Sequence, residues 1–124
     1  MASDTYHEPI EEISSSTRDM HRAITTLIEE LEAIDWYQQR AEACTDDELR
    51  AVILHNKNEE VEHAMMTLEW LRRKNPEFKR HVATYVNTEG AITAIEEEDE
   101  KEPQQGPSAA PGAGLGIGSL KERV

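Results

Sequence analysis

The chain has 124 residues, a formal net charge of −13 and one cysteine, Cys44. This length suits a single domain. So acidic a chain favours cations and disfavours nucleic acid, whose phosphates are bound by clustered Lys and Arg. One cysteine excludes an intrachain disulfide and fits a reducing compartment. Since no segment approaches the roughly 20 apolar residues of a membrane span and no apolar run follows the first Met, we expect a cytoplasmic protein without a membrane partner.

Residues 1–9 predict a flexible N-terminal arm, and the segment from about Ile10 to Arg40 predicts one long amphipathic helix. Its apolar residues recur at the three- and four-residue spacing of a helix face. They are Ile13, Met20, Ile24, Leu27, Leu31 and Ile34. Ser14 to Thr17 weaken the first turns, because their hydroxyls compete for backbone hydrogen bonds. A second start at Ser16 or Thr17 is therefore also consistent with the sequence.

A second helix is predicted from about Asp46 to Lys74. Thr45 to Glu48 resemble an N-cap followed by the acidic residues of a first turn, which stabilise a helix N-terminus. The short link through Cys44 implies an antiparallel helix pair. A shorter third helix is expected from Asn75-Pro76 to about Thr88, interrupted by Gly90. The expected fold is therefore all-α, with two long antiparallel helices plus a shorter C-terminal helix, completed to a four-helix bundle by dimerisation.

The stretch from His55 to Leu71 places a carboxylate and an imidazole on the apolar face of a helix. At about 100° per residue, Glu60 and His63 share that face, while Lys57 points elsewhere. The other residues of the face are Leu49, Val52, Ile53, Asn56, Thr67, Trp70 and Leu71. A buried charge is costly unless it is paired or bound to a metal, and residues at i and i+3 converge on one side of a helix. We therefore predict that Glu60 and His63 bind a metal ion or meet a charged partner from another helix.

Glu-x-x-His is also the arrangement of di-iron carboxylate bundles, in which two helices each supply one Glu and two others each supply a Glu-x-x-His. This chain has half of that set, namely Glu30 beside the apolar face of the first helix and Glu60 with His63 on the second. Two copies related by a two-fold axis supply the whole set, so we predict a homodimer that binds two iron ions. Carboxylate and imidazole suit iron, manganese also fits, and the lack of cysteine ligands disfavours structural zinc.

Two aromatic residues, Trp36 and Tyr37, lie one to two turns beyond Glu30 in the first helix. We interpret them as packing and interface residues near the predicted site. Electron donation to an oxidising di-iron centre is the alternative interpretation.

Two segments, EELEAIDWYQQR and HNKNEEVEHAMMTLEWLRR, closely resemble the encapsulated ferritins, and the likeness covers about residues 7–98. The resemblance implies a ferritin-like protomer, a ferroxidase centre formed across a dimer interface and a ring-shaped decamer of five dimers. The iron ligands that it implies are Glu30, Glu60 and His63. It also implies that Glu29 and Glu32 gather further metal ions on the approach to the centre, with Trp36 beside that route. The alternative for these two acids is a solvated acidic face.

The last part of the chain differs sharply in composition from the helical domain expected at residues 10–98. After a short turn through Ile92 and Ile95, the acidic run from Glu96 and the Pro/Gly/Ala-rich stretch predict a tether, with a disordered linker at residues 99–114. Residues 115–124 hold a compact apolar patch that resembles the cargo-loading peptide of encapsulin systems. The patch consists of Leu115, Gly116, Ile117, Gly118, Ser119 and Leu120. An encapsulin shell is therefore the expected partner.

These features together predict a ferroxidase that oxidises Fe²⁺ to Fe³⁺, with O₂ as the expected acceptor, and delivers iron for mineral storage inside an encapsulin nanocompartment. A protomer of two or three helices has no closed cavity for mineral, so the expected role is oxidation and not storage. The alternative is a non-enzymatic cargo or adaptor protein of the shell, in which the Glu/His cluster is a structural metal clip.

Overall fold

The computed structural model describes residues 5–101, whose regular structure is entirely helical. The elements are a 3-10 turn η1 (Ile10–Glu12) and four α-helices, α1 (Ser15–Ala43), α2 (Asp47–Lys74), α3 (Pro76–Tyr85) and α4 (Ile92–Lys101). They form two compact units, one ending at Asn75 and the other starting at Pro76. The all-α prediction with two long helices and shorter ones is confirmed. No helix within the described range is long and apolar enough to cross a membrane.

Helix α1 starts at Ser15 and not near Ile10, where the apolar spacing had placed the start. The hydroxyl of Ser14 accepts a hydrogen bond from the backbone N–H of Thr17 at 3.2 Å and caps the helix. A serine N-cap satisfies one of the unpaired N–H groups that every helix start exposes. The preceding residues form η1, which Arg18 ties to α1 by donating to the carbonyl of Ile10 at 2.6 Å. The serine-rich stretch therefore begins the helix, one residue before the alternative start at Ser16 that the sequence also allowed.

Helix α2 begins and ends close to the predicted residues. Asp46 is its N-cap, and the Asp46 side chain accepts from the backbone N–H of Leu49 at 2.8 Å. Asp47 and Glu48 follow as the acidic first turn, and three basic residues fill the last turn. The acids lie at the positive N-terminal end of the helix dipole and the basic residues at its negative C-terminal end, so both groups stabilise the helix. The first-turn acids Asp47 and Glu48 are confirmed, and the cap lies at Asp46, one residue after the expected Thr45.

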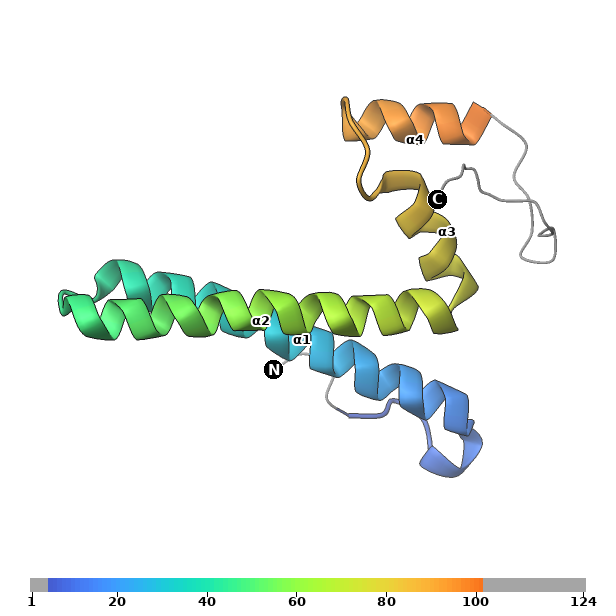
Figure 1. The fold of residues 1–124 in the computed structure, drawn as a ribbon. Helices are drawn as coiled ribbons and strands as arrows, with labels where there is room; N and C mark the ends of the chain where they lie inside the picture. The colour runs from blue at the N-terminus through green and yellow to red at the C-terminus, as the bar shows by residue number, and fades with distance from the viewer. Residues whose placement is uncertain (1–4, 102–124) are drawn as a thin grey trace. The chain divides into compact units, whose positions relative to one another are not determined.

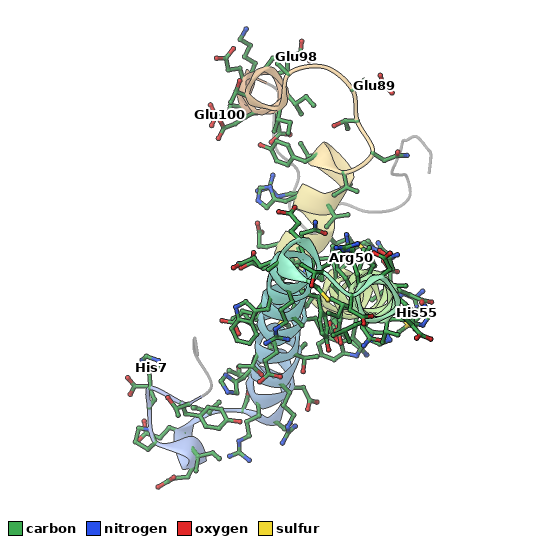
Figure 2. All side chains as sticks on the ribbon, turned by 90° about the vertical axis from the view of Figure 1, so that its left-hand side faces the viewer. His7, Arg50, His55, Glu89, Glu98 and Glu100 are labelled. Carbon is green, nitrogen blue, oxygen red and sulfur yellow. The ribbon has the colours of Figure 1, made fainter. Side chains whose placement is uncertain are left out.

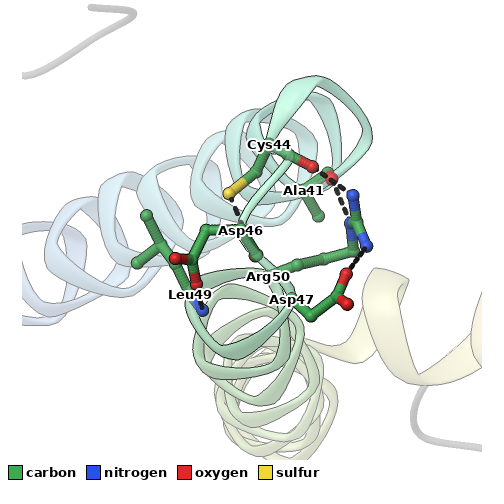
Figure 3. A network of polar contacts seen from close by, with 6 residues as sticks. All are labelled: Ala41, Cys44, Asp46, Asp47, Leu49 and Arg50. Atoms are coloured by element: carbon green, nitrogen blue, oxygen red, sulfur yellow. Dashed lines mark hydrogen bonds and ion pairs between the residues drawn. The ribbon is translucent and has the colours of Figure 1, made fainter.

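The link between α1 and α2 is held by one guanidinium group (Figure 3). Arg50 Nε donates to the carbonyl of Ala41 at 3.1 Å, and Nη2 donates to the carbonyl of Cys44. Nη1 donates to the carboxylate of Asp47 at 3.0 Å. The last carbonyls of a helix have no partner within the helix, so Arg50 of α2 satisfies the C-terminus of α1. This network turns the chain back on itself, and α1 and α2 form the expected antiparallel pair (Figure 1).

The face of α2 that packs on α1 repeats every seven residues. Arg50 and Lys57 reach α1 or its C-cap through hydrogen bonds, and Ala64 and Leu71, which continue the same spacing, are fully buried. The prediction that Lys57 points away from the helix pair is wrong, because Lys57 Nζ donates to Gln38 Oε1 of α1 at 2.8 Å. A lysine can lay its apolar stem along a helix interface while its charge reaches a polar partner. The side of α2 that contacts α1 thus contains Lys57, whereas Leu49 and Val52 lie outside the contact and are about half exposed.

Much of the apolar surface of the described chain is uncovered. Only Ala41, Ala64 and Leu71 are buried among its hydrophobic residues. The large hydrophobic side chains that are at least two-fifths exposed are Ile10, Leu31, Trp36, Leu49, Val52, Val61, Met65, Met66, Val86 and Ile92. The N-terminal half of α1 also diverges from α2 (Figure 1), and an open groove lies between Thr26 and Trp70. A surface this apolar is typical of a chain that associates with another chain.

The second unit consists of α3 and α4. Helix α3 starts at Pro76 as predicted but ends at Tyr85, three residues earlier than expected. Asn87 follows with a left-handed φ of 65°, a conformation that ends helices. A short turn was predicted through Ile92 and Ile95, but the structure has a helix of ten residues there, α4, which continues through the acidic stretch to Lys101. Arg80 of α3 lies 3.9 Å from the carboxylate of Asp99 in α4. The acidic run is therefore helical up to Lys101 and is not an extended tether there.

Candidate metal centre

Three side chains of the types that ligate metals come together between α1 and α2. Glu30 lies on α1, and Glu60 and His63 lie one turn apart on α2, as the i, i+3 spacing predicted. One ligand atom from each lies within 4.8 Å of the other two. The Nδ1 atom of His63 is 3.7 Å from Glu60 Oε1. No other trio of His, Cys, Asp or Glu within residues 5–101 is this close together.

The site is only half enclosed. The side chain of Glu60 is 26% exposed and that of His63 is 41% exposed, and Glu30 is also partly buried. The sequence predicted these groups on a buried face, and the described chain leaves that face open on one side. Two carboxylates and one imidazole are hard and intermediate donors that suit iron or manganese. Three donors do not fill the coordination of such an ion, so the geometry is that of a partial site.

Neither carboxylate of the trio is paired with a lysine or arginine among the ion pairs of the described residues. Glu69, two turns further along α2, shows the contrast, because it accepts hydrogen bonds from Arg72 at 2.8 and 2.9 Å and from Arg73 at 2.7 Å. These contacts, first with Arg72 and then with Arg73, lower the pKa of Glu69 to about 2. Glu69 is therefore engaged by guanidinium groups, whereas Glu30 and Glu60 keep acceptor sites for a cation.

Glu30 has one side-chain hydrogen bond across the helix pair. Thr67 Oγ1 of α2 donates to Glu30 Oε1 at 3.2 Å. The sequence placed Thr67 on the same face as Glu60 and His63 but gave it no role. The contact joins residues 37 positions apart, so only the alignment of the two helices reveals it.

Besides Glu60, a second carboxylate lies near the imidazole of His63, and it was not predicted from the sequence. Glu59 Oε1 is 4.0 Å from His63 Nε2, and Glu59 Oε2 is 4.0 Å from His55 Nε2. Figure 2 shows His55 on the side of α2 that faces away from α1, where its side chain is 71% exposed. The i, i+4 spacing of His55, Glu59 and His63 was the available signal. His63 thus lies between the carboxylates of Glu59 and Glu60.

The other predicted site residues lie on α1 outside the trio. Glu29 is exposed and Glu32 is partly exposed. Trp36 is 47% exposed. The ring of Tyr37 is stacked by Arg40, whose guanidinium carbon lies 5.7 Å from the ring centre. The predicted targeting residues 115–120 lie outside the described part of the chain.

Comparisons with known proteins point to one family. A protein-family model described as EncFtn-like matches residues 5–89. The encapsulated ferritin-like protein of Rhodospirillum rubrum is 52% identical over 126 residues, covering 97% of this chain and 90% of that protein. A ferritin-like protein of Thermotoga maritima is 44% identical, covering 94% and 98% of the two chains. The crystal structure of a protein from Nitrosomonas europaea superposes with a TM-score of 0.70 at 54% identity, covering 72% of this chain and 98% of that one.

Proposed function

Because the chain belongs to the EncFtn-like family of encapsulated ferritin-like proteins, we propose that it is a ferroxidase whose substrate, Fe²⁺, binds at Glu30, Glu60 and His63. The observation that carries the proposal is the approach of these three side chains to within 4.8 Å. A random surface Glu-x-x-His has no third ligand on a neighbouring helix. Here Glu30 supplies that ligand from α1.

The complete site is proposed to form between two copies of the chain. One protomer offers two carboxylates and one imidazole, and a two-fold axis doubles them to the four Glu and two His of a di-iron bundle. The open side of the site and the exposed apolar residues of α1 and α2 support this arrangement. Two helices alone bury little surface, so the same partner stabilises the fold and completes the site. Five such dimers in a ring are the assembly we propose.

The donor set also fits the direction of the reaction. Ionised carboxylates stabilise Fe³⁺ more than Fe²⁺, because the attraction grows with the charge of the ion. Two Fe²⁺ give up one electron each, and with O₂ as acceptor two protons are taken up to yield H₂O₂ and two Fe³⁺. His63 is a ligand in this scheme only when its imidazole is neutral at the coordinating nitrogen. The chain's own contribution is thus to hold two irons together in an acidic, partly enclosed site.

Four neighbouring residues of α1 receive secondary roles in the proposal. Glu29 and Glu32 attract Fe²⁺ on its way to the centre, and the exposure of Glu29 leaves its carboxylate open to cations. Trp36, which is 47% exposed, borders this route and packs against a second chain. Tyr37, stacked with Arg40, is a packing residue near the site.

The remaining proposal concerns location. The Rhodospirillum rubrum relative is named as encapsulated, and its similarity covers 97% of this chain, which is more than residues 5–101 make up. We propose an N-terminal arm at residues 1–9, a ferritin-like domain from residue 10 to the end of α4 at Lys101, a linker from there to residue 114 and a shell-docking peptide at 115–124. In this division the protein works in the cytoplasm inside an encapsulin shell, which collects the Fe³⁺ that it produces.

An anaerobic Fe²⁺ titration followed by admission of O₂ tests the proposal. Glu30→Ala, Glu60→Ala and His63→Ala are each expected to lose most Fe²⁺ binding and oxidation, because each ligand occurs twice in the completed site. Glu42→Ala, which removes an exposed acid of α1, is the matched control and is expected to behave as wild type. Near-normal oxidation in any of the three variants would remove that residue from the site. Stoichiometric metal binding by wild type without oxidation would favour the metal-clipped adaptor.

A further inference from the structure

We propose that Thr67 is a positioning residue that fixes the carboxylate of Glu30 for metal binding. The inference rests on the proposed metal site and adds a residue outside the metal ligands. Its basis is the hydrogen bond from Thr67 Oγ1 to Glu30 Oε1 at 3.2 Å. Thr67 lies four residues after His63 and seven after Glu60, so it shares their side of α2.

The direction of this hydrogen bond is unusual for a threonine inside a helix. Such hydroxyls commonly donate to the carbonyl one turn earlier in their own helix. Thr25 does so, donating to the carbonyl of His21 at 3.0 Å, and Thr84 donates to the carbonyl of Arg80 at 3.1 Å. A hydroxyl has one hydrogen. Because Thr67 donates it across the helix pair, that hydrogen is committed to Glu30.

The contact leaves Glu30 able to bind a metal. A carboxylate has two oxygens and about four acceptor positions, so the bond to Oε1 leaves Oε2 and further lone pairs for the ion. At 3.2 Å the bond is longer than the roughly 2.5 to 3.0 Å typical of O–H···O bonds, so its role is to orient the carboxylate and not to add much binding energy. Threonine also has few χ1 rotamers in a helix. The hydroxyl is thus a stiff donor that restricts the rotation of a long, flexible glutamate.

No other described side chain competes for this role. Among the hydrogen bonds and ion pairs of residues 5–101, Thr67 supplies the one side-chain donor to Glu30. Outer partners that orient metal ligands typically change metal affinity or activity about 10- to 100-fold when they are removed. This sets the size of the effect expected for Thr67.

The test measures binding of Co²⁺ alone by calorimetry, together with the visible spectrum of the Co²⁺-loaded protein. Thr67→Val keeps the shape of the side chain and removes the hydroxyl, and we expect its Co²⁺ affinity to fall about 10- to 100-fold with an altered spectrum. Thr67→Ser restores the donor and is expected to recover both. Thr25→Val, which removes a hydroxyl bonded within its own helix, is the control and is expected to match wild type.

A double-mutant comparison separates positioning from a general loss of stability. In a Glu30→Gln background, Thr67→Val is expected to cause little further loss of Co²⁺ affinity, because the carboxylate that it positions is already gone. An equal loss in both backgrounds would overturn the proposal. So would wild-type affinity and spectrum in Thr67→Val while Glu30→Gln is impaired. Unchanged Co²⁺ binding in Glu30→Ala, Glu60→Ala and His63→Ala would instead show that the proposed metal site itself is wrong.

Discussion

Replacing Ala64 by leucine tests whether the close approach of α1 and α2 creates the metal site. Ala64 follows His63 directly in α2 and is 0% exposed. Helix α1 is the element that packs on α2 in this unit. We infer that the small side chain of Ala64 allows the two helices to approach each other closely. Leucine at this position must push α1 away from α2 or distort its own rotamer.

The expected loss follows from the spacing of the ligand atoms. Metal–ligand distances to nitrogen and oxygen are roughly 2.0 to 2.2 Å, so two atoms bound to one ion lie at most roughly 4.4 Å apart. The three ligand atoms lie within 4.8 Å of one another, which is already about as far apart as one ion allows, so any further separation of the helices opposes joint binding. Overpacking typically costs about 1 to 3 kcal/mol in stability. We expect Ala64→Leu to weaken metal binding on the order of 10- to 100-fold, comparable to the loss of a ligand-orienting group.

The assay is calorimetric binding of Zn²⁺, a redox-inert ion, with far-ultraviolet circular dichroism to verify the helix content. Ala51→Leu, at an exposed position of α2, adds the same volume outside the packed seam and is expected to bind as wild type. Wild-type affinity in Ala64→Leu with full helix content would refute the reasoning. An equal loss in Ala51→Leu would also refute it, because the effect would then not depend on the helix spacing.

Three further outcomes are expected. Arg50→Met removes the donors to the carbonyls of Ala41 and Cys44 and should lower the free energy of unfolding in urea by about 1.5 to 2 kcal/mol, the low part of the range for charged hydrogen bonds, because the side chain is 37% exposed. Because the pKa of Glu69 is lowered to about 2, its ion pairs stabilise the fold above about pH 4.5, and this stabilisation is lost as the pH falls through about 2. The melting temperature of the metal-free Glu69→Gln variant should therefore fall less steeply than that of the wild type as the pH is lowered over this window. Deleting residues 115–124 should abolish co-purification with an encapsulin shell and leave Fe²⁺ oxidation intact; equal loading of the truncated chain would contradict the docking assignment.

The helix boundaries that sequence predicts best are those set by local capping. Pro76 as the first residue of α3 is confirmed, and the N-cap of α2 is Asp46, one residue after the expected Thr45, because both effects act within one turn. The start of α1 was placed too early, since the apolar spacing continued across Ser14, whose capping bond to Thr17 decides the start. Composition also failed for α4, where a run of acidic residues is helical to Lys101.

The candidate site was predictable in the part that lies on one helix. The i, i+3 spacing brings Glu60 and His63 together whatever else the chain does. The contacts across the helix pair depend on its alignment, which the apolar pattern of each helix does not determine. The bonds from Thr67 to Glu30 and from Lys57 to Gln38 were therefore missed. In the second case the 100° spacing placed Lys57 off the apolar face, although its side chain reaches Gln38 across the helix pair.

The central claim is that one protomer carries half of a di-iron site and that a second copy completes it. Native mass spectrometry of the protein titrated anaerobically with Fe²⁺ tests this claim most directly. A ligand that binds only the associated state shifts the equilibrium toward that state, so added Fe²⁺ should convert monomers to dimers and larger rings, with two irons per dimer and none retained by the monomer. Tight binding of two irons by a monomer that does not associate would contradict the claim.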